Sequence, residues 1–334
     1  MPTLAAVPPP DARPAAWRSI AGPALVAATV VLALYVLARL TQAHLQARGI
    51  ATGFGFLSQP ATFSIAESWI SFVPGRDSYA RALAAGAINT AFVSTLVIVL
   101  ATVLGAALGL ARLSPNWLLS RSAGAYVELM RNVPLPLHLL LWYQVLLNLP
   151  VPRQALRWGE WLVLSNRGLW LPAPGWRDGG PVLDLPVLRG FNFEGGLMLS
   201  PELAALTVAL TLYSAAFVGE IVRAGILSVP RGQWQAAQSL GLSRRDVLRW
   251  VVMPLSLRLV VPPLAGEYLN TVKNSSLAVV IGYPEITSLI NTMLSETGRP
   301  IEAVALLMLA YLTISVPVAL FMNWYNRRVA LPAR

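Results

Sequence analysis

The stretch AFVSTLVIVLATVLGAALGL, residues 91–110, contains no charged side chain. A helix of about 20 apolar residues rises about 30 Å, which matches the hydrocarbon thickness of a lipid bilayer. The nearest charged residues on the two sides are Arg81 and Arg112. This stretch therefore predicts a helix that spans a membrane.

Further apolar stretches on both sides of it predict an all-α integral membrane protein with six transmembrane helices. The stretch 254–281 is the least apolar of them, because it carries Arg258, Glu267 and Lys273. Charged groups are costly in hydrocarbon, so this helix is expected to face protein or water. The first stretch ends at Arg39 without a small-residue cleavage site, which favours an uncleaved anchor over a signal peptide. The predicted spans are 19–38, 91–110, 132–152, 203–229, 254–281 and 303–326.

The composition agrees with a membrane protein and excludes several kinds of site. Hydrophobic residues make up 56% of the chain and charged residues 12%, against about 45–50% and about 25% in soluble domains. Cysteine is absent, which excludes disulfides and cysteine-ligated metal centres. Lys273, the only lysine, follows Val272, whereas the phosphate-binding loop of ATPases needs a Gly-Lys pair. We expect neither catalysis nor a bound metal or cofactor in this chain.

The distribution of arginine predicts the orientation in the membrane. Alternate connecting segments, including both chain ends, hold 13 arginines and two acidic residues. The other segments hold nine arginines and nine acidic residues. Because basic residues concentrate in cytoplasmic loops, both termini are predicted to be cytoplasmic. The same distribution explains the net charge of +10 better than nucleic-acid binding, which needs a basic solvated domain.

The cytoplasmic loop 228–254 is predicted to be a pair of helices joined at a glycine. Residues 233–240 favour a helix, and Gly241 suits the left-handed position that follows a helix end. Ser243 precedes Asp246 by three residues, as at the start of a capped helix. Ala236 and Ala237 would present small side chains that let another protein approach, although the pattern also fits an ordinary helical hairpin.

This loop resembles the "EAA" loop of ABC-importer permeases, in which a coupling helix docks into the ATPase subunit. The usual glutamate is replaced by Gln235, which keeps the length but loses the charge. The residues that the resemblance assigns to ATPase coupling are Gln233, Gln235, Ala236, Ala237 and Gly241.

The resemblance extends over residues 86–326 and is specific to importers of polar amino acids. Segments 126–135, 216–226 and 269–282 resemble their core helices, with Asn274 in place of an aspartate. The insert 150–202 and the extra first span resemble the general L-amino-acid branch. The implied organisation is a tail, anchor and periplasmic loop (1–85), a permease domain (86–326) and a cytoplasmic tail (327–334).

The resemblance implies a bacterial inner-membrane permease that moves L-amino acids from the periplasm to the cytoplasm. Its expected partners are an ABC ATPase subunit carrying ATP and magnesium, a second permease, a periplasmic amino-acid-binding protein and membrane lipid. The alternative is a stand-alone secondary transporter, a class that often shows inverted repeats. The proline pair 262–263 in a charged span fits this class loosely, but the two halves show no repeat.

Charged and polar residues within the predicted spans are candidates for the substrate pathway. A zwitterionic amino acid needs an acceptor for its ammonium group and donors for its carboxylate. Two acid–arginine pairs, 128 with 131 and 220 with 223, have helical spacing and could instead satisfy each other. Lys273 has no acid within one helical turn, so it either faces the pathway, with Glu220 as a possible countercharge, or pairs with an acid on another helix. The candidates are Glu128, Asn132, Glu220, Arg223, Lys273, Asn274 and Ser275.

The insert 150–202 contains four tryptophans and is predicted to be periplasmic. Tryptophan is enriched where membranes meet water, so these side chains could form an interfacial belt. The alternative is a docking surface for a substrate-binding protein. The four are Trp158, Trp161, Trp170 and Trp176.

Overall fold

The computed structural model describes residues 16–47, 49, 52–177 and 180–329. The chain divides into two compact units at Phe54–Gly55. The first unit contains α1 (Ala16–Ala47), and the second contains the other elements apart from the first residue of η1 (Phe54–Ser58). The helices of the second unit are α2 (Tyr79–Arg112), α3 (Trp117–Asn132), α4 (Leu135–Leu147), α5 (Pro201–Leu227), α6 (Arg231–Ser239), α7 (Arg244–Asp246), α8 (Met253–Asn274), α9 (Ile286–Thr297) and α10 (Pro300–Val329).

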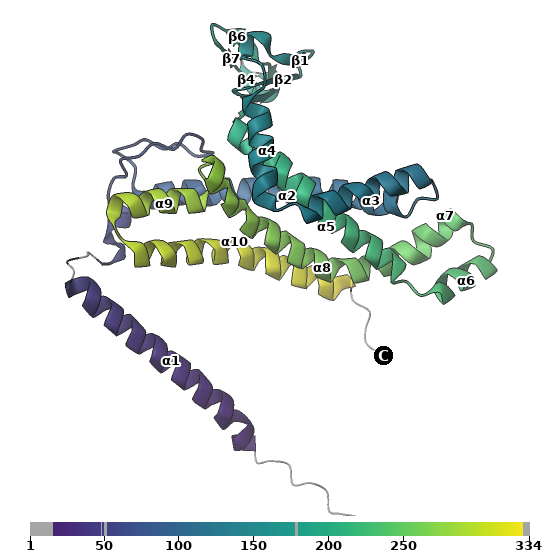
Figure 1. Cartoon of the computed structure of the whole chain (residues 1–334), viewed down its shortest axis with the longest axis horizontal. Coiled ribbons are helices and arrows are strands. Elements are labelled where there is room, and N and C mark those ends of the chain that lie inside the picture. The colour runs from purple at the N-terminus through teal and green to yellow at the C-terminus, as the bar shows by residue number, and fades with distance from the viewer. Residues whose placement is uncertain (1–15, 48, 50–51, 178–179, 330–334) are drawn as a thin grey trace, which may run out of the picture. The chain divides into compact units, whose positions relative to one another are not determined.

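Four helical segments of the described chain are long and apolar enough to cross a membrane. They are α2, α5, the segment Arg244–Ile281 that contains α8, and α10 (Figure 1). In α1 the apolar stretch runs only over Ala28–Thr41, and α4 has 13 residues. Long apolar helices are therefore present at the predicted stretches 91–110, 203–229, 254–281 and 303–326, while a total of six spans remains a prediction.

The predicted third span, 132–152, does not form one continuous helix. α3 ends at Asn132, and Val133 adopts an extended conformation (φ −93°, ψ 130°) before Pro134. A residue before proline is pushed out of the helical region by contact with the proline ring. The proline therefore separates the amphipathic helix α3 from the apolar helix α4. Within the predicted span the continuous helix is α4 alone, with 13 residues.

The insert is made of β-strands, so an entirely α-helical fold is wrong for this part of the chain. Strands β1 (Leu156–Trp158), β2 (Leu162–Ser165), β3 (Gly168–Leu171) and β8 (Leu197–Leu199) form an antiparallel sheet in that order. Two hairpins form separate two-stranded sheets, β4–β5 (Ala173–Arg177 and Gly180–Asp184) and β6–β7 (Val187–Arg189 and Asn192–Glu194). Figure 1 shows the strands gathered beyond the end of α4. Short strands with glycine turns carry little hydrophobic periodicity, which is why the charge-based analysis missed them.

The centre of the helical part is the close packing of α2 against α5. A Cβ added to Gly105 on α2 would lie 2.6 Å from Cβ of Val218 on α5. One turn later, a Cβ on Gly109 would lie 2.7 Å from the carbonyl oxygen of Gly219. Small residues four apart allow helix backbones to approach within a membrane. These glycines therefore set the distance between α2 and α5, and α8 packs against both helices.

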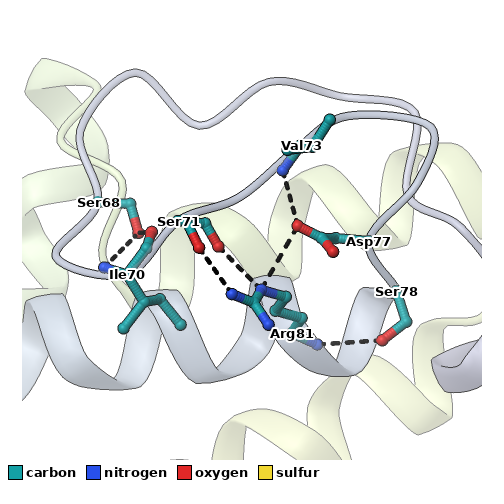
Figure 2. A network of polar contacts seen from close by, with 7 residues as sticks. All are labelled: Ser68, Ile70, Ser71, Val73, Asp77, Ser78 and Arg81. Atoms are coloured by element: carbon teal, nitrogen blue, oxygen red, sulfur yellow. Dashed lines mark hydrogen bonds and ion pairs between the residues drawn. The ribbon is translucent and has the colours of Figure 1, made fainter.

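The loop between residues 55 and 78 is held on the start of α2 by a polar network (Figure 2). Arg81 donates from Nε to the carbonyl oxygen of Ser71 (2.8 Å) and from Nη2 to its hydroxyl oxygen (2.9 Å). The same guanidinium pairs with Asp77 (3.4 Å), whose carboxylate accepts the backbone N–H of Val73 (2.7 Å). Ser78 caps α2 by accepting the N–H of Arg81. The loop is thus an ordered cover over α2.

The same loop is tied to α9 and to the start of α5. Thr62 and Tyr79 both donate to the carboxylate of Glu296 on α9, at 2.8 and 2.7 Å. Glu67 accepts the hydroxyl of Ser200, the residue that caps α5. Burial raises the pKa of Glu67, and the hydrogen bond from Ser200 opposes that change. These contacts join the helix ends on the side that the charge distribution assigns to the periplasm.

Candidate functional site

The loop that follows α5 forms the predicted pair of helices joined by a glycine turn. Gly241 has a φ of +81°, and its N–H bonds to the carbonyl of Gln238 (2.9 Å). The N–H of Leu242 reaches back to the carbonyl of Ala237 (3.3 Å). These two bonds make the Schellman ending of a helix, in which a left-handed residue favours glycine. The turn directs the chain back, so that α6 packs against the start of the next helix.

The second helix of the pair begins as the sequence predicts and then changes its pitch. The hydroxyl oxygen of Ser243 accepts the backbone N–H of Asp246 (3.3 Å), and the hydroxyl donates to its carboxylate (2.6 Å). After α7 the chain continues as a π-helix, η3 (Val247–Val252), before α8 begins at Met253. Such insertions are frequent at functional sites in helices.

One face of α6 is exposed and the other is buried. Gln233, Gln235 and Ala236 are exposed, and Leu240 at the helix end is 83% exposed. The sequence predicted that Ala237 is exposed for docking, and this prediction is wrong. The residue is 5% exposed and packs in an apolar cluster. A helix of nine residues with one buried stripe can present only its opposite face to a partner. Other buried members of the cluster are Ile226, Val229, Val247 and Val252.

Glu220 on α5 lies between two arginines. Its carboxylate pairs with Arg223 one turn along the same helix (2.5 Å) and with Arg112 at the end of α2. The helix-spaced pair that the sequence suggested is therefore present, with Arg112 as a further partner that sequence spacing did not indicate. No ion pair in the described part of the chain joins Glu220 to Lys273, so the predicted countercharge is not present there. The network connects α2 and α5 near their predicted cytoplasmic ends.

The predicted pair on α3 does not form. Glu128 and Arg131 are both exposed, and no ion pair joins them in the described part of the chain. The guanidinium carbon of Arg131 instead lies 5.2 Å from the ring centroid of Phe217 on α5, within the range of a cation–π contact. Asn132 is exposed at the last position of α3. Glu128 and Asn132 thus remain available to groups outside the chain.

The predicted polar group at the end of α8 divides into exposed and buried members. Lys273 is exposed and Asn274 half-buried. Ser275 is fully buried, and its hydroxyl donates to the carbonyl of Val272 (2.7 Å), so it offers little to a substrate. Within the ranges that the structure describes, Lys273 forms no ion pair. Its ammonium is therefore not held by Glu267 or Glu128 within this chain.

The candidate pathway residues occupy helices that share one neighbour. α5 packs against α3 and α8, and it carries Glu220 and Arg223 itself. A further acid lies where α8 packs against α5. This is Glu267 of α8, which is half-buried and within hydrogen-bonding reach of Ser214 on α5. Glu267 is not among the pathway candidates that the sequence predicted. Its position within a predicted membrane span could have identified it, because ionisable residues in such spans often belong to a substrate pathway.

Comparisons with known proteins connect this arrangement to a transport family. The family described as "binding-protein-dependent transport system inner membrane component" matches residues 101–331. The chain is 44% identical over 352 residues to the protein YhdX of Escherichia coli strain K12, covering 88% of this chain and 89% of that protein.

Two further comparisons agree with that match. The general L-amino acid transport system permease protein AapQ of Rhizobium johnstonii is 36% identical over 375 residues, covering 95% of this chain and 94% of that protein. A solved amino acid ABC transporter crystallised with histidines has a TM-score of 0.56 at 24% identity. That match covers 75% of this chain and 95% of the solved one, and it shows a common fold.

Proposed function

The chain belongs to the family of inner membrane components of binding-protein-dependent transport systems, and from this premise we propose that it carries L-amino acids into the cell as the permease subunit of an ATP-driven importer. It is a multi-pass membrane permease and a transport component rather than an enzyme or a stand-alone secondary transporter. The amino-acid substrate is proposed because AapQ, a similar protein over nearly its whole length, is named for general L-amino acid transport.

The observation that carries the mechanism is the geometry of the loop after α5. An exposed helix face bearing Gln233, Gln235 and Ala236 is set on a buried apolar base and ends in a Schellman turn at Gly241. A rigid protrusion of this kind transmits the movement of a docked partner to α5 and α8, between which it lies in the chain. We assign α6 as the coupling helix for a separate ATPase, on which ATP and magnesium would bind.

Reconstitution of the importer tests this function directly. The chain, its ATPase and its second permease are placed in liposomes with a binding protein, and uptake of labelled L-amino acids is measured. We expect uptake to require ATP and the binding protein. Uptake by this chain alone, driven by a proton gradient, would contradict the proposal and support a secondary transporter.

We propose six spans in all, with both termini in the cytoplasm and the β-strand insert in the periplasm. Support comes from the arginine distribution and from the four long apolar helices. α1 and the short α4, together with the chain on either side of it, supply the other two spans. A reporter fused at Gly180 is expected to be active only when it is a periplasmic reporter. Activity only as a cytoplasmic reporter would reverse the assignment.

The domain limits and the second permease are also part of this proposal. We retain 86–326 as the permease domain, with 1–85 preceding it and 327–334 as the tail.

A second permease or lipid must cover α10, because only 6% of its apolar window is buried within the chain. Exposed apolar side chains on α10 include Met308, Leu309, Leu312, Leu320 and Phe321.

The insert is proposed to dock a substrate-binding protein. Trp170 is excluded from this surface, since it is 1% exposed and packs on Phe193 in the core of the insert. Trp158, Trp161 and Trp176 are 59%, 65% and 76% exposed. Tryptophan is enriched at the centres of protein interfaces. The sheet is stabilised by its own core, which leaves these side chains free for a partner, although an interfacial belt would also use them.

Lys273 is proposed to face the substrate pathway, together with Glu128, Asn132 and Asn274. Replacement of Lys273 by methionine keeps most of the side-chain volume and removes the charge. We expect uptake to fall about tenfold or more, which corresponds to about 1.4 kcal/mol or more, or the preference among acidic, neutral and basic amino acids to change. The measurement is uptake across that panel, normalised to the amount of assembled complex.

A matched Lys273→Arg variant retains the charge and is expected to keep most of the uptake. Unchanged uptake of all three substrate classes by Lys273→Met would contradict the pathway assignment. Loss of the Lys273→Met protein from the membrane would instead identify the lysine as a structural residue at the contact with the second permease.

A further inference from the structure

An apolar groove lies beside the coupling loop, at the ends of α2 and α5. Its volume is about 1330 Å³, larger than the roughly 300–1000 Å³ of common small-molecule pockets. Ala107 and Leu110 of α2, Leu119 of α3 and Leu227 of α5 form part of its floor. Leu110, Leu119 and Leu227 are 42%, 49% and 59% exposed, so the floor is open rather than filled by the chain itself.

Three arginines are also among the residues that line this groove. Arg231 is the first residue of α6, and Arg244 and Arg245 are the first two residues of α7. All three are exposed, and within the described residues none of them forms an ion pair. The nearby acid Asp246 is engaged by the hydroxyl and cap of Ser243. The groove therefore combines an apolar floor with an uncompensated positive rim.

In the proposed orientation of the chain, the groove lies near the boundary between the acyl tails and the headgroups of the inner leaflet. α2 and α5 end at Arg112 and Leu227, and the arginines follow on the loop beyond these ends. Basic pockets between transmembrane helices on the cytoplasmic side bind anionic lipid headgroups. A free phosphate would use the arginines but leave the apolar floor in water, whereas a phospholipid covers both.

We propose that this groove binds an anionic phospholipid, with the acyl chains on Ala107, Leu110 and Leu227 and the phosphate on Arg231, Arg244 and Arg245. The lipid then lies against α6 and connects the coupling loop to α2. The inference rests on the proposed orientation of the chain in the membrane, but not on which amino acids are carried.

Native mass spectrometry of the assembled importer with added phosphatidylglycerol tests the site. Each arginine near an anionic lipid contributes about fivefold to affinity, so Arg244→Gln/Arg245→Gln is expected to weaken binding by about 30-fold. The matched control Arg327→Gln/Arg328→Gln removes two exposed cytoplasmic arginines of α10 that do not line the groove. It is expected to leave that binding event unchanged, and zwitterionic phosphatidylcholine is expected to bind weakly in every case.

A third variant separates a lipid from a free anion. Ala107→Phe fills part of the apolar floor without changing any charge, and it should reduce phosphatidylglycerol binding but not binding of inorganic phosphate. Equal losses in the two double variants would contradict the site. Unchanged binding of phosphatidylglycerol by Ala107→Phe would also contradict it. If phosphatidylglycerol binds the permease only when the ATPase is absent, the groove is an interface with the ATPase and the proposal fails. Amino-acid uptake is measured in parallel for each variant. Normal uptake with unchanged lipid binding would reject the lipid site alone and leave the proposed transport function intact.

Discussion

Replacement of Gly105 by leucine is expected to prevent accumulation of the folded permease. A Cβ at this position would lie 2.6 Å from Cβ and Cγ1 of Val218 and 2.8 Å from the carbonyl oxygen of Ala215. The latter is backbone within α5, so the clash cannot be relieved by a rotamer change. Overpacking of a core costs about 1–3 kcal/mol for small additions and more for larger ones. Membrane abundance and thermal stability in detergent measure the effect.

Gly266 on α8 provides the matched control. It also lies inside a membrane-spanning helix, but a Cβ built there meets nothing within 4 Å. Gly266→Leu is therefore expected to accumulate normally, and Gly105→Ala should show an intermediate loss. Normal abundance and stability of Gly105→Leu would show that α2 and α5 are not held at the distance described here.

Replacement of Gly241 by aspartate is expected to reduce ATP-driven uptake by at least about tenfold while the permease remains inserted. The φ of +81° disfavours a side chain, but no atom lies within 4 Å of the added Cβ. The folding cost is therefore limited to about 1–2 kcal/mol of backbone strain. A carboxylate left unpaired in a protein interface costs about 2–5 kcal/mol, so docking should suffer more than folding. Uptake and ATPase association are measured together.

Gly241→Asn separates the charge from the backbone effect. Asparagine tolerates the left-handed conformation at least as well as aspartate and has nearly the same shape. It is expected to retain most of the uptake, with stability equal to that of Gly241→Asp. Equal loss of uptake in the two variants would place the defect in the turn itself, and normal uptake in Gly241→Asp would remove the coupling assignment.

Local spacing predicted several features of the candidate site, although the pair of Glu128 with Arg131 does not form in the described part of the chain despite its helical spacing. The Schellman turn at Gly241, the capped start of α7 and the pair of Glu220 with Arg223 all follow from spacings of three to five residues. Contacts between distant segments were not predictable. Arg112 joins Glu220 from another helix, and Ala237 is buried because α6 folds back onto Val247 and Val252.

The sequence by itself determined that this is a membrane protein, since transfer of apolar helices into hydrocarbon depends on composition and length. It also predicted the two helices joined at Gly241 in the loop after α5. It also determined which loops are basic. Only the tertiary structure decided that the insert forms a sheet around Trp170 and that Gly105 and Gly109 pack closely against α5. Packing depends on shape across segments that lie far apart in the chain, and charge-free windows carry no information about that shape.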